Sequence, residues 1–367
     1  YFIKLFFFIK RLYFKGKSYE LLSLYFNTKD DPDVEACPFL VDEKNMAKIK
    51  MAKDIIINDD IIKQGERKHI HLEIARLYDS TEMSLDIEVI RGKEDGPVLF
   101  LSAAAHGDEI NGTEIIRRIL ASQYLNDIKG TVIAVPIVNA YGFNTKSRYL
   151  PDRRDLNRCF PGSSEGSLAA RLADVFIRDV VDQSTHGIDF HTGAINRTNW
   201  PQIRACLDDG EVSKMAKDFA APVILNEQLR EGSLREYCCN NNVPIILFEG
   251  GEALRFQKNA IQSGFDGTLR VMAGLGMIDP SALPVPETKP QYLKNNYWVR
   301  APQSGILITK KQLGESVEKN DVLGVITNAF GQYSVDIMAS NAGVIIGATT
   351  SPLLNQGDAA YHIAQRE

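Results

Sequence analysis

The sequence predicts an α/β protein with a mixed sheet, parallel in its centre and flanked by helices, followed by a small all-β domain. Between residues 68 and 249, apolar strand-like runs alternate with amphipathic helical runs. This alternation is typical of a sheet covered by helices on both faces. Beyond residue 296 only short β runs and glycine turns remain. A length of 367 residues also favours two domains over one.

The first predicted elements are strands rich in β-branched and aliphatic residues, separated by short turns. A helix follows, because Ile115, Ile116 and Ile119 recur at helical spacing. The later apolar runs are interpreted in the same way. The predicted strands are 68–77, 83–92, 97–105, 131–139, 187–191, 202–207 and 243–249, and the predicted helices are 111–127, 166–182, 211–220 and 231–241.

The chain changes character at the proline-rich segment DPSALPVPETKP. After it, VRAPQSGILI is echoed by IMASNAGVII, and VEKNDVLGVI is echoed by LNQGDAAYHI. Two offset copies of a strand–turn–strand unit predict a small barrel-sandwich domain with pseudo-two-fold symmetry. The predicted division is an N-terminal extension (1–50), a catalytic domain (51–280), a linker (281–295) and a β domain (296–367), called the β tail below.

Composition limits the choice of partner. The net charge of −5 and the pI of about 5.8 argue against nucleic acid and anionic membranes. Five cysteines without a CxxC pair favour reduced thiols and a cytoplasmic protein. The apolar, basic N-terminal segment is either a membrane-surface helix or a leader translated from upstream of a natural start at Met46 or Met51. We expect the leader.

A candidate metal site begins with AHGDE, between a predicted strand and a predicted helix. His106 and Glu109 are three residues apart, so one helical turn can aim both at one point. IDFHTG places His191 at the end of another strand, where it could supply a third ligand. Three protein ligands with one position left for water are typical of catalytic zinc.

Two further segments carry charged residues suited to hydrolysis. RYLPDRRDLNRCFPG is an arginine-rich loop, and arginine grips carboxylates bidentately. LFEGG places Glu249 at the end of an apolar strand, where burial raises a carboxyl pKa toward that of a general base. A solvated basic loop and a structural salt bridge are the alternatives for these two segments.

With HGDE, DLNR, FPG, DFHTG and FEGG in this order, the chain resembles the succinylglutamate desuccinylase/aspartoacylase family, related to zinc carboxypeptidases. The resemblance covers roughly residues 65–366. It implies a zinc carboxypeptidase-like fold and hydrolysis of the amide bond of a small N-acyl amino acid. The implied metal ligands for one zinc ion per chain are His106, Glu109 and His191, and Glu249 matches the glutamate that activates water.

The resemblance also implies substrate contacts. Asn157 and Arg158 match the pair that holds the substrate carboxylate, and Arg148 and Arg235 match further substrate-binding arginines. Asp155 is expected to orient the loop. The β tail is similar to the barrel-sandwich domain of one branch of the family and to biotinyl or lipoyl carrier domains. Its hairpin TNAFGQYSVDI has no lysine to carry a cofactor, so a structural or oligomerisation role, including a homo-oligomer, is expected.

Two other functions stay open. A metallocarboxypeptidase would need the same metal and arginines, because it also cuts an amide beside a carboxylate. A non-catalytic binding protein could carry a decayed site, although the intact set of ligands, arginines and base argues against it. The acyl group is not encoded in any residue we can place, and other divalent ions can use the same ligands.

Overall fold

The computed structural model describes residues 54–286 and 289–366, so the predictions made for residues 1–50 lie outside the described residues. The strands are β1 (Ile55–Ile57), β2 (Asp60–Ile62), β3 (Arg67–Arg76), β4 (Glu82–Arg91), β5 (Glu94–Ala103), β6 (Lys129–Val135), β7 (His186–Gly193), β8 (Arg197–Ala205), β9 (Val223–Asn226), β10 (Ile245–Glu252), β11 (Gln291–Arg300), β12 (Gly305–Thr309), β13 (Ser316–Val317), β14 (Val322–Thr327), β15 (Ser334–Met338), β16 (Gly343–Thr349), β17 (Leu353–Leu354) and β18 (Ala359–Arg366). The α-helices are α3 (Asn111–Leu120), α4 (Ala140–Thr145), α5 (Leu168–Phe176), α6 (Gly210–Phe219), α7 (Leu234–Asn240) and α8 (Lys258–Gly274). Short 3-10 or π turns are η1 (Gln123–Leu125), η2 (Leu156–Arg158), η3 (Ile177–Val181) and η4 (Pro280–Ala282).

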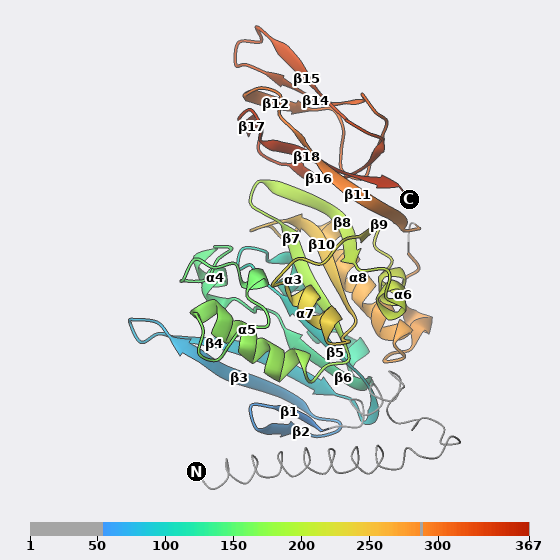
Figure 1. The fold of residues 1–367 in the computed structure, drawn as a ribbon. Coiled ribbons are helices and arrows are strands. Elements are labelled where there is room, and N and C mark those ends of the chain that lie inside the picture. The colour runs from blue at the N-terminus through green and yellow to red at the C-terminus, as the bar shows by residue number, and fades with distance from the viewer. Residues whose placement is uncertain (1–53, 287–288, 367) are drawn as a thin grey trace, which may run out of the picture. The chain divides into compact units, whose positions relative to one another are not determined.

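One sheet organises the fold (Figure 1). Within the described residues it has twelve strands in the order β13-β16-β18-β11-β9-β8-β10-β7-β5-β6-β4-β3. The neighbours β10, β7, β5 and β6 are all parallel, whereas β3 with β4, β4 with β6 and β8 with β10 pair in antiparallel fashion. The predicted α/β fold with a mixed sheet, parallel in its centre, is confirmed. The parallel strands matter for function because their carboxyl ends lie at one edge.

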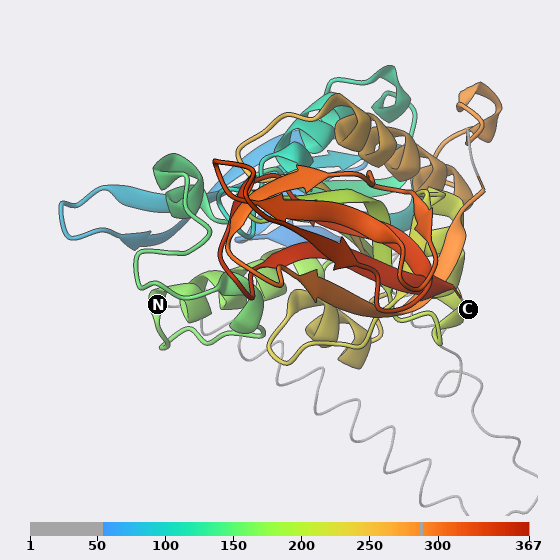
Figure 2. The ribbon, with the colours of Figure 1, turned by 90° about the horizontal axis from the view of Figure 1, so that it is seen from above.

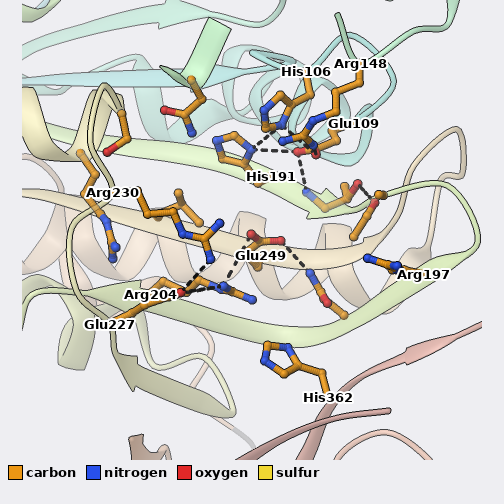
Figure 3. A pocket seen from close by; sticks show the side chains of 18 of the residues that line it. His106, Glu109, Arg148, His191, Arg197, Arg204, Glu227, Arg230, Glu249 and His362 are labelled. Carbon is orange, nitrogen blue, oxygen red and sulfur yellow. Dashed lines mark hydrogen bonds and ion pairs between the residues drawn. The ribbon is translucent and has the colours of Figure 1, made fainter. Parts of the chain in front are cut away.

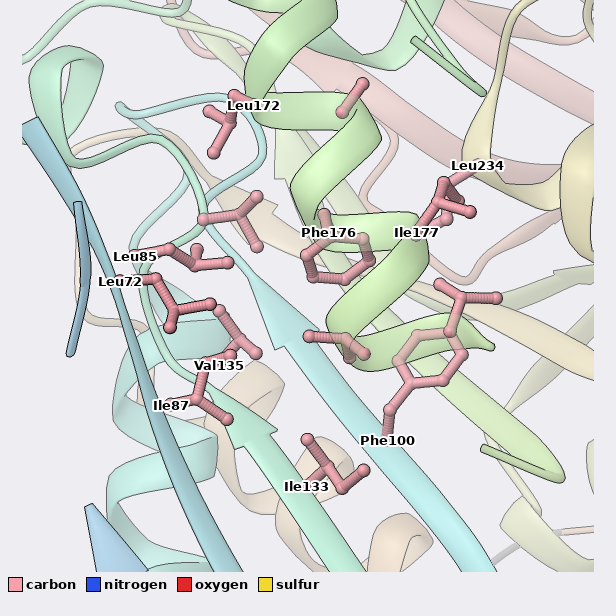
Figure 4. Close-up of a cluster of buried hydrophobic side chains, with 14 of the residues drawn as sticks. Leu72, Leu85, Ile87, Phe100, Ile133, Val135, Leu172, Phe176, Ile177 and Leu234 are labelled. Carbon is pink, nitrogen blue, oxygen red and sulfur yellow. The ribbon is translucent and has the colours of Figure 1, made fainter. Parts of the chain in front are cut away.

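Helices cover both faces of this sheet, as Figure 2 shows from above. On one face, Phe100 of β5 meets Phe176 of α5 edge-on, with ring centroids 6.1 Å apart. Figure 4 shows this core, which also takes Leu85 and Ile87 from β4. The opposite face is covered by α3, α6 and α8. Both faces of the central strands are therefore buried, which explains their continuous apolar sequences.

Two predicted helices differ in their limits. The helix predicted over 111–127 ends at Leu120, because Ser122 is extended and its hydroxyl donates to the Ile119 carbonyl. The helix predicted over 166–182 begins at Leu168, where the Ser167 hydroxyl caps the first turn, and it finishes as the π turn η3. Local side-chain hydrogen bonds thus set the end of α3 and the start of α5, and the apolar spacing alone does not predict these positions.

The β tail joins the main sheet. β11 begins at Gln291, so residues 291–295, predicted as linker, are strand; β11 pairs with β9 in parallel and with β18 in antiparallel fashion. β16 also pairs with β8, which explains why β8 starts at Arg197, earlier than the predicted 202–207. Non-local pairing of this kind leaves no periodicity signal in the sequence.

The internal repeat appears as equivalent pairings. In the first copy β12 pairs with β14, and in the second β16 pairs with β18. Each copy also pairs with a short strand of the other, because β12 contacts β17 and β16 contacts β13. A separate core that includes Leu323, Ile326 and Tyr361 lies between these strands. Among the described helices, none combines the length and apolarity needed to cross a bilayer.

Candidate metal centre and its cavity

A cavity of about 310 Å³ opens at the carboxyl ends of the central strands. Its lining comes from the loop after β5, from β7, β8 and β10, from the η2 and α7 region, and from the β tail. The structure brings all eight sequence-predicted site residues to this one cavity: His106, Glu109, Arg148, Asn157, Arg158, His191, Arg235 and Glu249. The order of the motifs along the chain therefore corresponds to a single place in the fold.

His106, Glu109 and His191 form a buried cluster whose donor atoms all lie within 4.8 Å of one another (Figure 3). The Nδ1 atom of His106 lies 2.8 Å from Glu109 Oε1, and Nδ1 of His191 lies 2.8 Å from Glu109 Oε2. The two Nδ1 atoms are 3.2 Å apart. Two imidazole nitrogens and a carboxylate thus converge on one point, the ligand set of a catalytic zinc site.

Each histidine also binds a carboxylate through its other nitrogen. His106 Nε2 lies 3.0 Å from Asp155 Oδ1, and His191 Nε2 lies 2.8 Å from Asp189 Oδ2. A carboxylate accepts, so each Nε2 donates its proton outward, and Nδ1 is the nitrogen that turns toward Glu109 and the other histidine. Carboxylates behind the ligands are typical of histidines that bind metals.

The negative charge around the two histidines makes the cluster suited to a cation. Glu109 holds protons on the facing Nδ1 atoms, and a divalent ion that displaces those protons would use the same three donor atoms. Burial by itself lowers the pKa of His191, but Asp189 and Glu109 outweigh it and raise that pKa well above its usual value. The same negative field attracts a divalent ion, so the residues present fit a metal.

The arginine-rich loop supports this cluster. Arg148 donates through Nη1 to Glu109 at 3.1 Å and through Nη2 to Asp155 at 2.9 Å. Asp155 also accepts the backbone N–H of Asn157 at 2.9 Å, so it orients the loop as expected and binds His106 as well. Arg148 therefore binds Glu109 of the metal cluster and the Asp155 carboxylate that contacts His106, and its predicted substrate contact stays a prediction.

The predicted substrate pair lies in the same cavity. The Asn157 side chain is fixed because its Oδ1 accepts the backbone N–H of Leu234 at 2.9 Å. Arg158 is exposed, and its guanidinium donates to the Asn157 carbonyl. Arg235 is buried, with Nη2 donating to the Gln228 carbonyl at 2.8 Å. These contacts leave cationic donors directed toward the cavity.

Glu249 is beside the metal cluster by strand register. It pairs with His191 across the parallel strands β10 and β7, so both side chains point to the same face. Its Oε2 accepts a 2.7 Å hydrogen bond from Asn199, and its Oε1 is 3.8 Å from Arg204 Nε. Burial raises the pKa of Glu249, and the charge of Arg204 offsets only part of this. A carboxylate with a raised pKa is suited to proton transfer.

A second charged group surrounds Glu227. Arg204 donates to both Glu227 oxygens, at 3.2 and 2.9 Å, and Arg230 donates at 3.1 Å. The pKa of Glu227 is lowered, because Arg204, Arg235 and Arg230 outweigh its burial. Among the described residues, Arg204 Nε and Arg235 Nη1 are buried without a hydrogen-bond partner. The cavity therefore offers donors beyond those that Glu227 uses.

The β tail supplies the remaining wall through Asn296, Trp298 and His362, which we call the tail-lined wall. The His362 ring stacks on Trp298, with centroids 4.3 Å apart and planes 6° from parallel. Arg197 lies over the same indole, 5.2 Å from its centroid. The β tail therefore helps to form the cavity, beyond the structural or oligomerisation role expected from the sequence.

Sequence reasoning missed several of these residues. Asp189 could have been found from the sequence, because it lies two positions before His191 in DFH and alternate residues of a strand share a face. Asn199, Arg204 and Glu227 belong to no motif, and only the pairing of β8 with β10 brings the first two near Glu249. The tail-lined wall depends on contacts between segments far apart in the chain.

Comparisons with known proteins agree with this geometry. Residues 95–275 match the succinylglutamate desuccinylase/aspartoacylase catalytic domain. The chain is 27% identical over 287 residues to N-alpha-acetyl-L-2,4-diaminobutyric acid deacetylase of Halomonas elongata, a match that covers 74% of this chain and 83% of that protein.

Solved structures share the fold. The product-bound ectoine utilization protein EutE (DoeB) from Ruegeria pomeroyi superposes with a TM-score of 0.74 at 24% identity, covering 85% of this chain and 99% of that one. A succinylglutamate desuccinylase from Silicibacter sp. TM1040 gives a TM-score of 0.74 at 24% identity, covering 86% of this chain and 100% of that one.

Fold and site together define an α/β protein with a candidate metal centre at the carboxyl ends of its parallel strands. Residues 95–275 carry the catalytic domain of the succinylglutamate desuccinylase/aspartoacylase family.

Proposed function

We propose that this protein uses one zinc ion, held by His106, Glu109 and His191, to hydrolyse the amide bond of an N-acyl amino acid. The observation that carries the proposal is the pair of imidazole Nδ1 atoms 3.2 Å apart, each opposite a nitrogen bound to a carboxylate. When bound, zinc supplies Lewis-acid activation of a water molecule and of the amide carbonyl.

Glu249 is the general base. It takes a proton from the attacking water and later passes that proton to the leaving amine, so that a carboxylic acid and a free amino acid are released. Asn199 orients this carboxylate through its 2.7 Å hydrogen bond. The raised pKa of Glu249 supports the second step, because a more basic carboxylate holds the proton long enough to transfer it.

The amino-acid carboxylate is held by Asn157 and Arg158, with Arg235 as a further cationic donor. The buried, unpartnered Nη1 of Arg235 supports this role, since a buried cation without a partner is costly until an anion or polar group binds. Arg148 steadies Glu109 and Asp155.

The relative from Halomonas elongata supports an acyl group as small as acetyl, since its name specifies an N-alpha-acetyl substrate. We also propose the division into a catalytic domain (51–280) and a barrel-sandwich domain (296–367). In this division the second domain closes one side of the cavity of the first.

The test uses the full chain purified without chelator. Metal content and amine release from a panel of N-acyl amino acids and short peptides are measured on the same preparation, before and after chelation. We expect about one zinc per chain and chelator-sensitive release from the N-acyl amino acids. Glu249→Gln should keep the zinc and lose about 10²- to 10⁴-fold in kcat. Full activity of a folded Glu249→Gln variant would remove the assignment, and release from peptides alone would indicate a carboxypeptidase.

A further inference from the structure

His362 is a buried polar side chain in the tail-lined wall that the proposed chemistry does not use. It is 3% exposed and lines the cavity. Its Nε2 lies 2.8 Å from the Oδ1 of Asn296, and its Nδ1 is buried with no hydrogen-bond partner in the described part of the chain. An unpartnered buried polar atom on a side chain that lines a cavity indicates a ligand contact, because a buried polar group without a hydrogen bond costs stability.

The hydrogen bond to Asn296 defines what Nδ1 can offer. An amide oxygen accepts, so His362 Nε2 carries the proton and Nδ1 presents a lone pair. Burial, with the positive charge of Arg204 next in importance, lowers the pKa of His362 to about 3. The ring is therefore neutral near pH 7, and Nδ1 accepts a hydrogen bond without carrying charge.

The surrounding charges limit which donor can bind there. Arg204, Arg230 and Arg197 lower the pKa of His362 and Glu227 raises it, so the net field of these four groups still disfavours a cationic ligand group. A carboxylate has no proton to donate to the Nδ1 lone pair. It would place a second hydrogen-bond acceptor against Nδ1. The suitable partner is an uncharged N–H or O–H group.

Arg204 adds the complementary feature. Its Nε is a buried donor that makes no hydrogen bond to any described residue. Figure 3 shows Arg204 and Glu249 between the metal cluster and His362. A ligand group with an acceptor for Arg204 and a donor for His362 would satisfy both, and a carboxamide has this pair of atoms.

On the proposed function, the amino-acid half of the substrate is the half directed toward this wall. Arg235, proposed to bind near its carboxylate, is influenced by Glu227 and Arg204, and both of these also act on His362. We propose, on the basis of the function given above, that His362 and Arg204 select N-acyl amino acids whose side chain ends in a carboxamide.

The test compares ligands of similar size. One set is N-acetylasparagine, N-acetylaspartate and N-acetylleucine, and a second is N-acetylglutamine, N-acetylglutamate and N-acetylmethionine. In at least one set, the zinc-loaded full chain should hydrolyse the carboxamide with kcat/KM about tenfold or more above the other two. An unmatched buried polar group discriminates by at least this much.

Three variants separate a ligand contact from a structural role. His362→Phe keeps a ring to stack on Trp298 and should reduce the carboxamide preference about tenfold. His362→Gln restores an acceptor and should recover part of that preference. Tyr361→Phe removes a hydrogen bond to the Leu323 carbonyl in the core of the β tail and should leave the preference unchanged.

Binding of the same ligands to zinc-loaded Glu249→Gln, measured by calorimetry, separates this inference from the proposed function. Carboxamide-selective binding without hydrolysis by the wild type would support the inference and remove the function. Hydrolysis without preference, or an equal preference in wild type and His362→Phe, would overturn the inference and keep the function. Neither binding nor hydrolysis of any ligand would overturn both.

Discussion

At the metal end of the cavity, His106 and His191 each have both ring nitrogens engaged, one with Glu109 and one with an outer carboxylate. At the tail-lined wall, His362 has one nitrogen on Asn296 and one without a partner in the described structure. Fully paired groups are held in fixed geometry and suit a resident ion. A group left unpaired is available to a ligand that comes and goes, so the two ends differ in purpose.

Removing a proposed metal ligand gives the largest expected effect and tests the metal half of this comparison. His191→Ala should lose the ion and reduce kcat/KM about a thousandfold or more, because Lewis-acid activation disappears. Metal content and amine release on the purified variant measure this. His186→Ala is the matched control, since His186 is another buried histidine of β7 outside the cavity lining. A His191→Ala variant with full metal content would break the comparison.

The next largest effect is expected from changing Asp189, the carboxylate that contacts His191 Nε2. In Asp189→Asn the side-chain oxygen can still accept a hydrogen bond from His191 Nε2, but the negative charge is lost. The metal affinity should therefore fall about 10- to 100-fold. Competition with a chelator measures the affinity. Asp179→Asn serves as control, because Asp179 is equally buried but pairs with Arg178 and with the backbone of Asn58. Equal metal affinity in the two variants would mean that the outer carboxylates are only structural.

The two ends also differ in how far the sequence predicts them. His106 and Glu109 are neighbours in one turn, and His191 follows a strand, so short motifs contain most of the metal cluster. Asp189 could have been added from strand alternation alone. The α/β sheet could equally be predicted from the sequence, because its buried strands are continuous apolar runs.

The tail-lined wall could not be predicted in this way. A register shift between Lys294 and Asn296, at Asn295 with φ 48°, sets which residues of β11 face the cavity. The pairing of β16 with β8 joins residues about 150 positions apart, as Gly347 opposite Asn199 illustrates. Such contacts depend on tertiary packing, which neither spacing nor composition encodes.

That pairing allows the β tail to act on the base. A methyl group added at Gly347 would lie 2.9 Å from Asn199 Oδ1 and 3.2 Å from His362 Cβ, so the Asn199 side chain must shift and its bond to Glu249 weakens. Gly347→Ala should therefore reduce kcat about tenfold, which corresponds to about 1.4 kcal/mol and lies within the worth of a hydrogen bond to a charged group. The measurement is kcat with metal saturating.

Gly210→Ala is the matched control for this change. Gly210 is the first residue of α6, and a methyl group added there would meet nothing within 4 Å. The kcat of Gly210→Ala should therefore equal that of the wild type. If Gly347→Ala and Gly210→Ala were equally active, the β tail would cover the cavity without influencing Glu249. A loss confined to Gly347→Ala would instead show that crowding of Asn199 and His362 where β16 meets β8 lowers the activity that depends on Glu249.

The last prediction concerns stability and compares His186, outside the cavity lining, with His362 of the tail-lined wall. Burial lowers the pKa of His186 to about 4 and that of His362 to about 3. Both are neutral in the fold but gain a proton near pH 6.5 when unfolded, so the stability they contribute is complete above that pH and is lost below it. Each should contribute a slope of about 1.4 kcal/mol per pH unit as the pH falls from 6.5 toward the folded pKa.

Urea unfolding between pH 7 and pH 5 at fixed metal concentration measures this slope. His186→Gln and His362→Gln should each make it shallower, whereas His71→Gln should not, because Asp86 and Glu82 raise the pKa of His71. The difference between variant and wild type isolates the histidine from any loss of metal. An unchanged slope in His362→Gln alone would mean that His362 is hydrated in the free protein. The contrast between a paired and an unpaired end of the cavity would then be lost.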